Sequence, residues 1–336
     1  MILKDRVDTF KKLGVIFSNP ESMMCINDTI ELAYKNNSWF TADNIKFSLL
    51  ALAKMLDRKQ LILWVQSYNI INQNKRIGVV VPSNIPFVGF YDFLCVLLSG
   101  NIFVGKLSSS NNILLPYLSK ILIDINPDFK KYIFFEQDLK NIDLLIATGN
   151  NNSASYFHSK YSNLKKIIRH NRTSIGVVNG LETKRDYHNL QYDICTYFGL
   201  GCRSVSKLFI PKGFDFQKMK AVFDCSHILQ SHSDYIDNYR YQKTLYKMNK
   251  VDFIDFHNLL LVESNEIESP VSVLYYQYYD HVNDVLSLLN KNSHHIQCVV
   301  SKDSAIQDSI SFGSAQQPTL YNFPDGVDVM QFIVSH

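Results

Sequence analysis

The sequence predicts an α/β protein whose strands form parallel sheets. Short runs rich in valine and isoleucine recur along the chain, as expected for buried parallel strands. Segments with the apolar spacing of helices separate most of these runs, so strands alternate with crossover connections. The length of 336 residues, of which 46% are hydrophobic, suggests two domains or one elaborate α/β unit.

Residues 1–75 are predicted to be a helical N-terminal segment. Apolar residues at 45, 49, 52 and 56 follow helical spacing, and Asp43 is placed to cap that helix. This segment carries no diagnostic motif.

Residues 76–172 are predicted to form a Rossmann-like, doubly wound domain that binds a cofactor. Its first strand ends in a loop bounded by Pro82 and Pro86, and an apolar helix follows. The predicted strands lie at 77–81, 102–107, 132–135 and 143–148, and the predicted helices lie at 87–98, 114–125 and around 154–157.

Residues 173–300 are predicted to form a second α/β domain, and residues 301–336 a C-terminal strand segment. A helix at 189–198 leads toward Cys202 in the second domain. The C-terminal segment is a candidate contact between the subunits of a homodimer. The predicted strands lie at 174–178, 205–210, 259–262, 271–276, 296–300 and 329–334.

Composition argues against several classes of partner. The 34 basic and 31 acidic residues form no basic stripe, so we expect no nucleic-acid partner. The longest apolar stretch, residues 87–98, contains Asp92 and is too short to span a bilayer. The first residues lack the apolar core of a signal peptide, which predicts a cytoplasmic location. The six cysteines show no metal-binding or disulfide spacing, so no metal is expected.

Cys202 is the candidate nucleophile. It lies in Gly199-Leu-Gly-Cys-Arg203, where two glycines allow a tight turn and close approach of another molecule. The charge of Arg203 would favour the nucleophilic thiolate, and His158 or His170 are candidate bases. A small buried hydrophobic residue is the commoner role of a free cysteine and stays an alternative.

Asn84 and Lys106 follow strands at the edge where open α/β sheets bind ligands. The Asn84 amide lies in the proline-bounded loop and could donate to a developing oxyanion; a turn-forming asparagine is the alternative. Lys106 precedes three serines, including Ser109, which suits a phosphate or ribose; a solvated lysine is the alternative.

The segment Thr148-Gly149-Asn150 closes a further strand and opens a helix. Backbone N–H groups at such a helix start can face a pyrophosphate, although the segment is not a GxGxxG motif.

In this order, the motifs resemble the aldehyde dehydrogenase superfamily. The matching segments are 82–86, 100–106, 148–149, 199–202 and 266–271. Within the superfamily, the chain is more similar to the fatty acyl-CoA reductases of bacterial bioluminescence. The segments that carry this closer resemblance are 168–174, 179–183, 197–207 and 325–328. The resemblance covers about residue 76 to the end and implies an aldehyde dehydrogenase-like fold.

The resemblance also implies roles for single residues. Cys202 would be the nucleophile, and Asn84 would form an oxyanion hole with the backbone N–H of Cys202. The implied cofactor-binding residues are Lys106 and Ser109 near the adenosine ribose or its phosphate, Thr148, Gly149 and Asn150 near the pyrophosphate, and Glu266 at the nicotinamide ribose.

Two departures from the superfamily's patterns refine the implied activity. Aldehyde-oxidising relatives carry a Glu-Leu-Gly-Gly element whose glutamate activates water, whereas residues 168–172 offer no carboxylate. This favours reduction of a thioester over oxidation of an aldehyde. The Lys-Pro-x-Glu pattern of NAD-preferring members is Lys106-Leu-Ser-Ser109 here, which favours NADPH, with NADH as the alternative.

The implied function is therefore NADPH-dependent reduction of an acyl-CoA, or of an acyl-carrier thioester, to an aldehyde. A CoA-independent aldehyde dehydrogenase is one alternative. A cysteine acyltransferase or thioesterase, or a non-catalytic acyl-binding protein, would instead need no nicotinamide.

Overall fold

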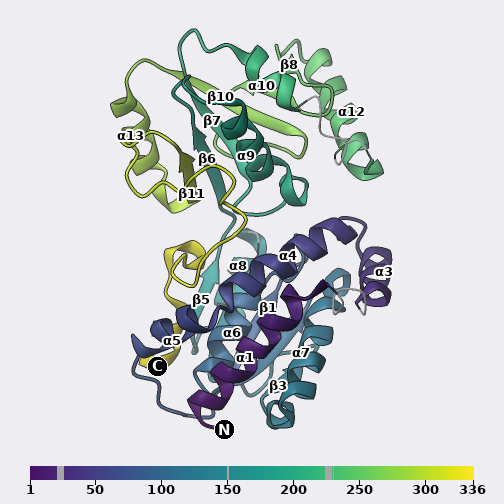
Figure 1. Cartoon of the computed structure of the whole chain (residues 1–336), viewed down its shortest axis with the longest axis vertical. Helices are drawn as coiled ribbons and strands as arrows, with labels where there is room; N and C mark the ends of the chain where they lie inside the picture. Colours follow the sequence, from purple (N-terminus) through teal and green to yellow (C-terminus); the bar gives the residue numbers. More distant parts are fainter. Residues whose placement is uncertain (21–25, 150, 224–228, 230) are drawn as a thin grey trace. The chain divides into compact units, whose positions relative to one another are not determined.

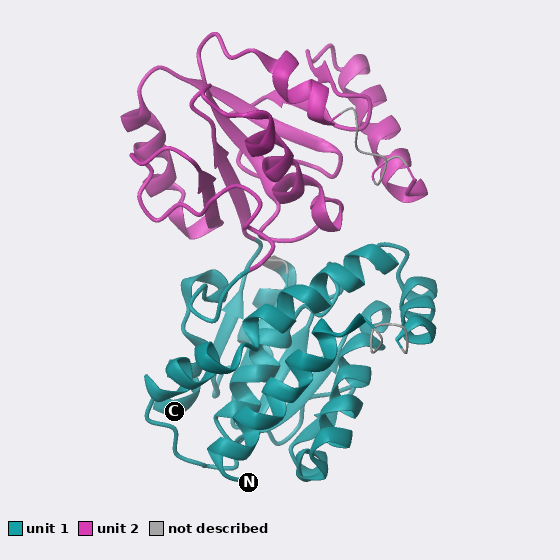
Figure 2. Ribbon diagram, in the orientation of Figure 1, with its two compact units in different colours: residues 1–171, 318–336 teal, residues 172–317 magenta. Residues whose placement is uncertain are grey.

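The chain divides into two compact units, which Figure 2 distinguishes by colour. The structure is a computed structural model that describes residues 1–20, 26–149, 151–223, 229 and 231–336. Unit 1 comprises Met1–Asn171 and Pro318–His336, and unit 2 comprises Arg172–Gln317. Figure 1 labels most of the helices and strands of both units.

Unit 1 contains a five-stranded parallel sheet in the order β3-β2-β1-β4-β5. Alternate residues of β4 pack on opposite faces: Leu144 and Ile146 join the larger core, whereas Leu145 and Ala147 pack with α8. Both faces are therefore covered, as a doubly wound sheet requires. The strands are β1 (Arg76–Val81), β2 (Ile102–Leu107), β3 (Ile133–Phe135), β4 (Leu144–Thr148) and β5 (Lys165–Arg169).

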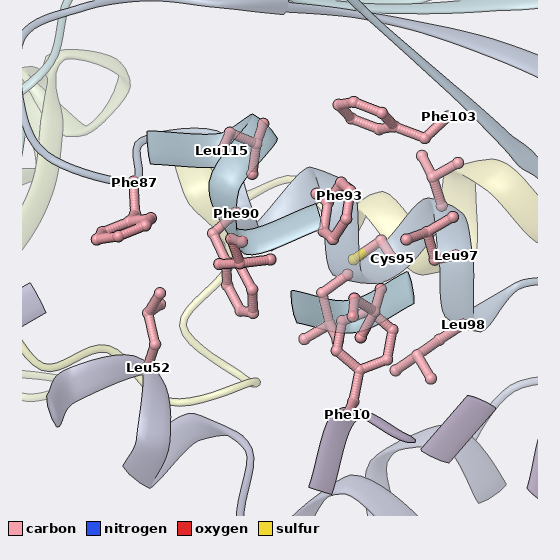
Figure 3. Packing of buried hydrophobic residues seen from close by; sticks show 14 of the residues in the cluster. Phe10, Leu52, Phe87, Phe90, Phe93, Cys95, Leu97, Leu98, Phe103 and Leu115 are labelled. Atoms are coloured by element: carbon pink, nitrogen blue, oxygen red, sulfur yellow. The ribbon is translucent and has the colours of Figure 1, made fainter. Parts of the chain in front are cut away.

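The N-terminal helices belong to the core of unit 1. Phe10 of α1 packs edge-on against Phe93 of α6, with ring centroids 6.3 Å apart, and Phe93 packs against Phe103 of β2 at 4.9 Å. Figure 3 shows this apolar cluster. Burying an aromatic ring of this kind stabilises the fold by about 1.5–3 kcal/mol. The helices are α1 (Leu3–Ser18), α3 (Asn27–Asn36), α4 (Ala42–Met55), α5 (Arg58–Gln66), α6 (Phe90–Leu98), α7 (Leu114–Ile125), α8 (Asn151–Lys160) and α14 (Val329–Ser335), with short 3-10 turns η1 (Ser109–Asn111), η2 (Pro127–Lys131) and η5 (Pro324–Gly326).

Unit 2 contains a six-stranded sheet in the order β11-β6-β7-β10-β9-β8, in which β8 alone of the described strands runs antiparallel. Its strands are β6 (Thr173–Val177), β7 (Val205–Pro211), β8 (Ile254–Asp255), β9 (Leu260–Glu263), β10 (Val273–Tyr279) and β11 (Ile296–Ser301). Its helices are α9 (Lys184–Cys195), α10 (Phe216–Phe223), α12 (Ser233–Met248) and α13 (Val282–Lys291), with 3-10 turns η3 (Thr196–Gly199) and η4 (Ser293–His295).

The predicted α/β class is confirmed, but the strand prediction at 329–334 is wrong. These residues form α14, which packs in unit 1. The Asp328 side chain accepts a hydrogen bond from the backbone N–H of Gln331 and caps the helix. Val329, Met330 and Ile333 then share one buried face. A short apolar run fits a strand or a buried helix equally well by periodicity, which explains the error.

The boundary of the predicted helix at 189–198 is also corrected, because α9 ends at Cys195. The strand β5 was not among the predicted strands, since its two lysines obscure the apolar pattern. Among the helices that the structure describes, none has the length and apolar character needed to cross a membrane.

The packing of α14 generates a stability prediction. Met330 is fully buried, whereas its neighbour Gln331 is exposed. We expect Met330→Ala to lower the free energy of unfolding by about 2–5 kcal/mol, and Gln331→Ala to change it by less than about 0.5 kcal/mol. Urea titration followed by tryptophan fluorescence measures both, because Trp39 and Trp64 lie in unit 1. Equal effects of the two variants would argue against the buried helix.

Candidate active site

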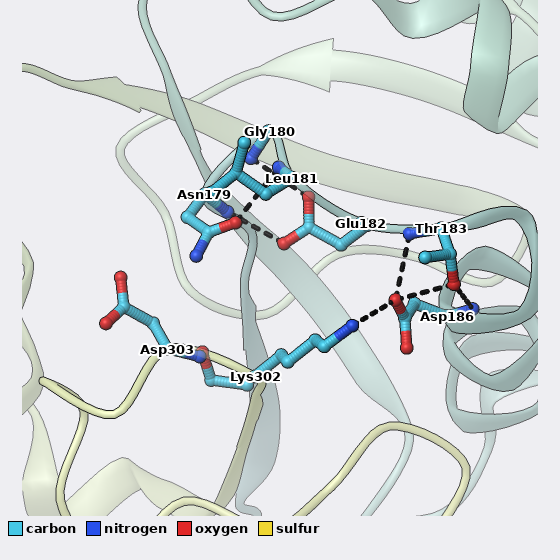
Figure 4. Close-up of polar contacts among 9 residues, drawn as sticks. Asn179, Gly180, Leu181, Glu182, Thr183, Asp186, Lys302 and Asp303 are labelled. Carbon is cyan, nitrogen blue, oxygen red and sulfur yellow. Dashed lines mark hydrogen bonds and ion pairs between the residues drawn. The ribbon is translucent and has the colours of Figure 1, made fainter.

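The helix that precedes Cys202 begins at a polar turn after β6. The Glu182 carboxylate accepts the backbone N–H groups of Asn179 and Gly180, both at 2.9 Å. Thr183 and Asp186 form a reciprocal capping box at the start of α9. Figure 4 shows these contacts. The motif at 179–183 therefore starts the helix, and its side-chain oxygens are engaged in that task.

Three consecutive left-handed residues follow α9. Tyr197, Phe198 and Gly199 have φ values of 55°, 57° and 78°. A left-handed aromatic residue costs about 1–3 kcal/mol, so surrounding contacts must compensate. Both aromatic side chains are buried, and the Phe198 ring lies 4.4 Å from the His232 ring, centroid to centroid. Burial of these rings holds the backbone in the conformation that leads into the cysteine turn.

Cys202 is exposed at the tip of a tight turn. The N–H of Ser204 donates to the carbonyl oxygen of Gly201 at 2.9 Å and closes the turn. From β6, the fully buried Ser174 donates its hydroxyl to the carbonyl oxygen of Cys202 at 3.0 Å. The turn is therefore attached to the sheet through the backbone, and the thiol group stays at the surface.

Arg203 attaches the same turn, and Asp193 attaches α9, to residues 313–315. The Nε of Arg203 donates to the carbonyl oxygen of Ala315. The Asp193 carboxylate accepts the N–H groups of Gly313 at 2.6 Å and Ala315 at 2.9 Å. Burial raises the pKa of Asp193 to about 6, although these bonds and the charge of Arg203 lower it. Arg203 thus has a structural role, besides the electrostatic one that the sequence predicts.

In unit 1, the strand order reverses between β1 and β4, and their carboxyl ends flank this switch point. The loop after β1 carries Asn84, which is exposed. Asn111 donates to the carbonyl oxygen of Pro82 at 2.7 Å, and Ser48 donates to that of Pro86 at 3.2 Å. The loop is thus fixed on both sides of Asn84, as a preorganised hydrogen-bond donor requires.

Thr148 and Gly149 lie at the other side of the switch point. A Cβ on Gly149 would come within 2.8 Å of the Ser153 side chain, so the turn into α8 keeps a bare backbone there. Such a cradle at a helix start fits a pyrophosphate. Asn150, the third predicted residue of this segment, lies outside the described residues.

Lys106 lies at the carboxyl end of β2, and Ser109 follows that strand. Lys106 is half-buried near the end of β2, where it pairs with Val80 of β1. Ser109 is exposed at the start of η1, and its carbonyl oxygen accepts the side-chain amide of Asn36 at 3.1 Å. The structure therefore gathers Asn84, Lys106, Ser109, Thr148 and Gly149 at the carboxyl edge of one sheet.

Glu266 lies in unit 2, on the segment that connects β9 with β10. Its side chain is exposed. The neighbouring Ile267 accepts the hydroxyl of Ser206 at 2.8 Å, and Ser206 belongs to β7, the strand that follows the Cys202 turn. Unit 2 therefore brings the Glu266 segment to the beginning of β7. The candidate bases His158 and His170 are exposed residues of unit 1.

Four residues near these positions were not selected from the sequence: Asp92, Arg169, Ser174 and Lys207. Arg169 and Asp92 form a buried, two-pronged ion pair with both distances at 2.7 Å, and Arg169 also donates to Thr148 at 3.4 Å. Burial opposes the charge of Arg169, but Asp92 raises the net pKa above its ordinary value. The sequence does hold one signal for this pair, because Asp92 is a carboxylate inside the otherwise apolar run 87–98.

Together, the two mainly parallel sheets, the strand-end loops and the exposed cysteine turn define an α/β protein with a candidate covalent-catalysis site. The family model of the acyl-CoA reductases (LuxC) matches residues 54–232, and the chain belongs to this family. It matches no curated protein sequence.

Solved structures of aldehyde dehydrogenases share the fold. An acetylating aldehyde dehydrogenase from Geobacillus thermoglucosidasius matches with a TM-score of 0.65 and 11% identity, over 95% of this chain and 86% of that one. The NAD+ complex of an aldehyde dehydrogenase from Bacillus cereus matches with a TM-score of 0.64 and 12% identity, over 91% and 73%. Indole-3-acetaldehyde dehydrogenase from P. syringae, in complex with NAD+ and IAA, matches with a TM-score of 0.65 and 8% identity, over 92% and 74%. The predicted aldehyde dehydrogenase-like fold is confirmed.

The attachment of the Cys202 turn generates a prediction about reactivity. We expect Ser174→Ala to slow acylation of Cys202 by an acyl-CoA about 10- to 100-fold, because the Cys202 carbonyl loses its bond to the Ser174 side chain and the backbone that carries the thiol becomes less fixed. Intact-protein mass spectrometry of samples quenched at successive times measures the rate of acylation. Ser287→Ala is the matched control, since that exposed hydroxyl on α13 donates only to a helix carbonyl. If both variants react like the parent protein, Ser174 does not position Cys202.

Proposed function

We propose that this chain reduces an acyl-CoA, or another acyl thioester, to an aldehyde with NADPH. The observation that carries the proposal is the exposed Cys202, held on a bonded turn in a chain of the acyl-CoA reductase family. The Cys202 thiolate attacks the thioester carbonyl, an acyl-cysteine forms, and CoA leaves as the free thiol.

Asn84 is proposed as the side-chain donor to the oxyanion of this step. Its loop is held at Pro82 and Pro86, so the amide needs little reorganisation when charge develops on the substrate oxygen. The backbone N–H of Cys202 is proposed as the second donor. The general acid and base are not assigned.

A nicotinamide cofactor fits the residues at the strand ends of unit 1. The bare backbone of Gly149 at the start of α8 suits the pyrophosphate, while Lys106 and Ser109 suit the adenosine ribose or its phosphate. Glu266 is proposed to bind the nicotinamide ribose. When bound there, NADPH would supply a hydride to the acyl-cysteine carbonyl and become NADP+. The resulting thiohemiacetal anion on Cys202 would collapse to the aldehyde and the Cys202 thiolate, ready for the next acyl thioester.

Two of the similar structures support a nicotinamide cofactor, since they are described as complexes with NAD+. Reduction is proposed over hydrolysis because residues 168–172, where aldehyde-oxidising relatives have their water-activating glutamate, contain no carboxylate. A thioesterase is the second candidate function, because it would use Cys202 as the nucleophile and need no nicotinamide.

The lifetime of the acyl-enzyme tests the proposal. We expect acyl-CoA without NADPH to add one acyl group at Cys202, and this species to persist far longer than one reductive turnover. General-base assistance contributes about 10²–10⁴-fold, so its absence makes hydrolysis slow. Added NADPH should then discharge the acyl group as aldehyde. Intact-mass and product measurements follow both stages, and Cys202→Ser should remain unlabelled. Rapid release of free fatty acid without NADPH would favour the thioesterase.

The choice of cofactor generates a separate prediction at Ser109. An acidic side chain there would repel the 2′-phosphate of NADPH but not the 2′-hydroxyl of NADH. We therefore expect Ser109→Glu to raise the KM for NADPH roughly 10-fold or more relative to that for NADH. Ser109→Gln, which has the same shape without the charge, should leave the ratio close to that of the parent protein. A parent protein that uses both cofactors equally would refute the NADPH preference but not the reaction.

A further inference from the structure

Lys207 is a buried lysine of unit 2 that the proposed reaction does not use. It lies on β7, and its exposed fraction is 2%. Its Nζ donates to the side-chain oxygen of Gln277 at 2.7 Å and to the carbonyl oxygen of Ser264 at 3.0 Å. Burial lowers the pKa of Lys207 to about 8, and the nearby negative charge of Glu266 opposes that shift.

A β-bulge directs this side chain. The pairing of β6 with β7 shifts register, so that Ser174 opposes Val205 and the next residue, Ile175, opposes Lys207. The extra residue, Ser206, donates to the carbonyl oxygen of Ile267 at 2.8 Å. A bulge re-aims side chains next to a functional site, and here two neighbouring residues of β7 both reach the segment that connects β9 with β10.

The hydrogen bonds of Lys207 and Ser206 hold the chain on both sides of Glu266. Lys207 holds Ser264 on one side and Ser206 holds Ile267 on the other. The N–H of Glu266 also donates to the Ser264 hydroxyl at 3.1 Å. The backbone around Glu266 is thus fixed against β7, whose first residue follows the Cys202 turn closely.

We propose that Lys207 is a positioning residue, which fixes the Glu266 segment so that the glutamate meets the cofactor in register with Cys202. The inference rests on the proposed function. Its chemical logic is that a buried lysine costs desolvation energy, and an apolar residue of similar volume would often serve the fold equally well. Lys207 instead supplies two directed hydrogen bonds, and one of them ends at Ser264, two residues before Glu266.

Lys207→Met removes these bonds and preserves most of the volume. We expect the KM for NADPH to rise about 10-fold, as for the loss of one charge-assisted hydrogen bond, while acylation of Cys202 without cofactor changes less than about 2-fold. Lys243→Met is the matched control, because Lys243 pairs with Asp255 at 2.6 Å elsewhere in unit 2. It should leave both quantities unchanged.

A double-mutant comparison separates positioning from general damage. If Lys207 acts through Glu266, the KM of Lys207→Met/Glu266→Gln should match that of Glu266→Gln alone. The inference would be overturned if the KM effects of the two substitutions multiply in the double variant. It would also be overturned if Lys207→Met leaves the KM for NADPH unchanged, or reduces acylation and cofactor use equally. Should Lys207→Met fail to fold, Ser206→Ala removes the neighbouring bond and should shift the KM in the same direction. Failure of the parent protein to use any nicotinamide would instead refute the proposed function and the inference with it.

Discussion

A hydrogen bond from the hydroxyl of the buried Ser174 to the carbonyl oxygen of Cys202 connects the exposed cysteine to the sheet of unit 2. The contact is made with the backbone, so the thiol is held in place without being buried. The surrounding features act on the same turn. Tyr197 and Phe198 precede the turn in left-handed conformations that the burial of their rings stabilises. Arg203 connects the turn to Ala315 by a hydrogen bond. The exposure of the cysteine and the rigidity of its backbone therefore have separate structural origins.

Unit 1 uses a buried ion pair for a comparable purpose. Asp92 lies in the first turn of α6 and Arg169 ends β5, so their pair joins a helix to the carboxyl edge of the sheet. Burying two charges costs several kcal/mol, and a two-pronged geometry offsets more of that cost than a single contact would. Arg169 also reaches Thr148, and its carbonyl oxygen accepts the Gly149 N–H. Arg169 therefore supports the turn that is proposed to hold a pyrophosphate.

Sequence patterns predicted the central strands because those strands are buried on both faces. The run in β1 is rich in valine and that in β4 in leucine and isoleucine, both are short, and turn residues follow them. The same reasoning failed at Val329–Ser335, where a capping aspartate and tertiary packing select a helix. Ser174 and Lys207 were missed for another reason: their partners lie 28 or more residues away. No local spacing signals such contacts, whereas Cys202 was marked by its own glycines.

The most direct test of the central claim is the stoichiometry of complete turnover with acyl-CoA and NADPH. Nicotinamide absorbance gives the NADPH consumed, a thiol assay gives the CoA released, and mass spectrometry identifies the acyl product. A thioester reductase predicts one NADPH oxidised and one CoA released for each aldehyde formed, with no activity in Cys202→Ser. Release of CoA with free fatty acid and unchanged NADPH would contradict the account.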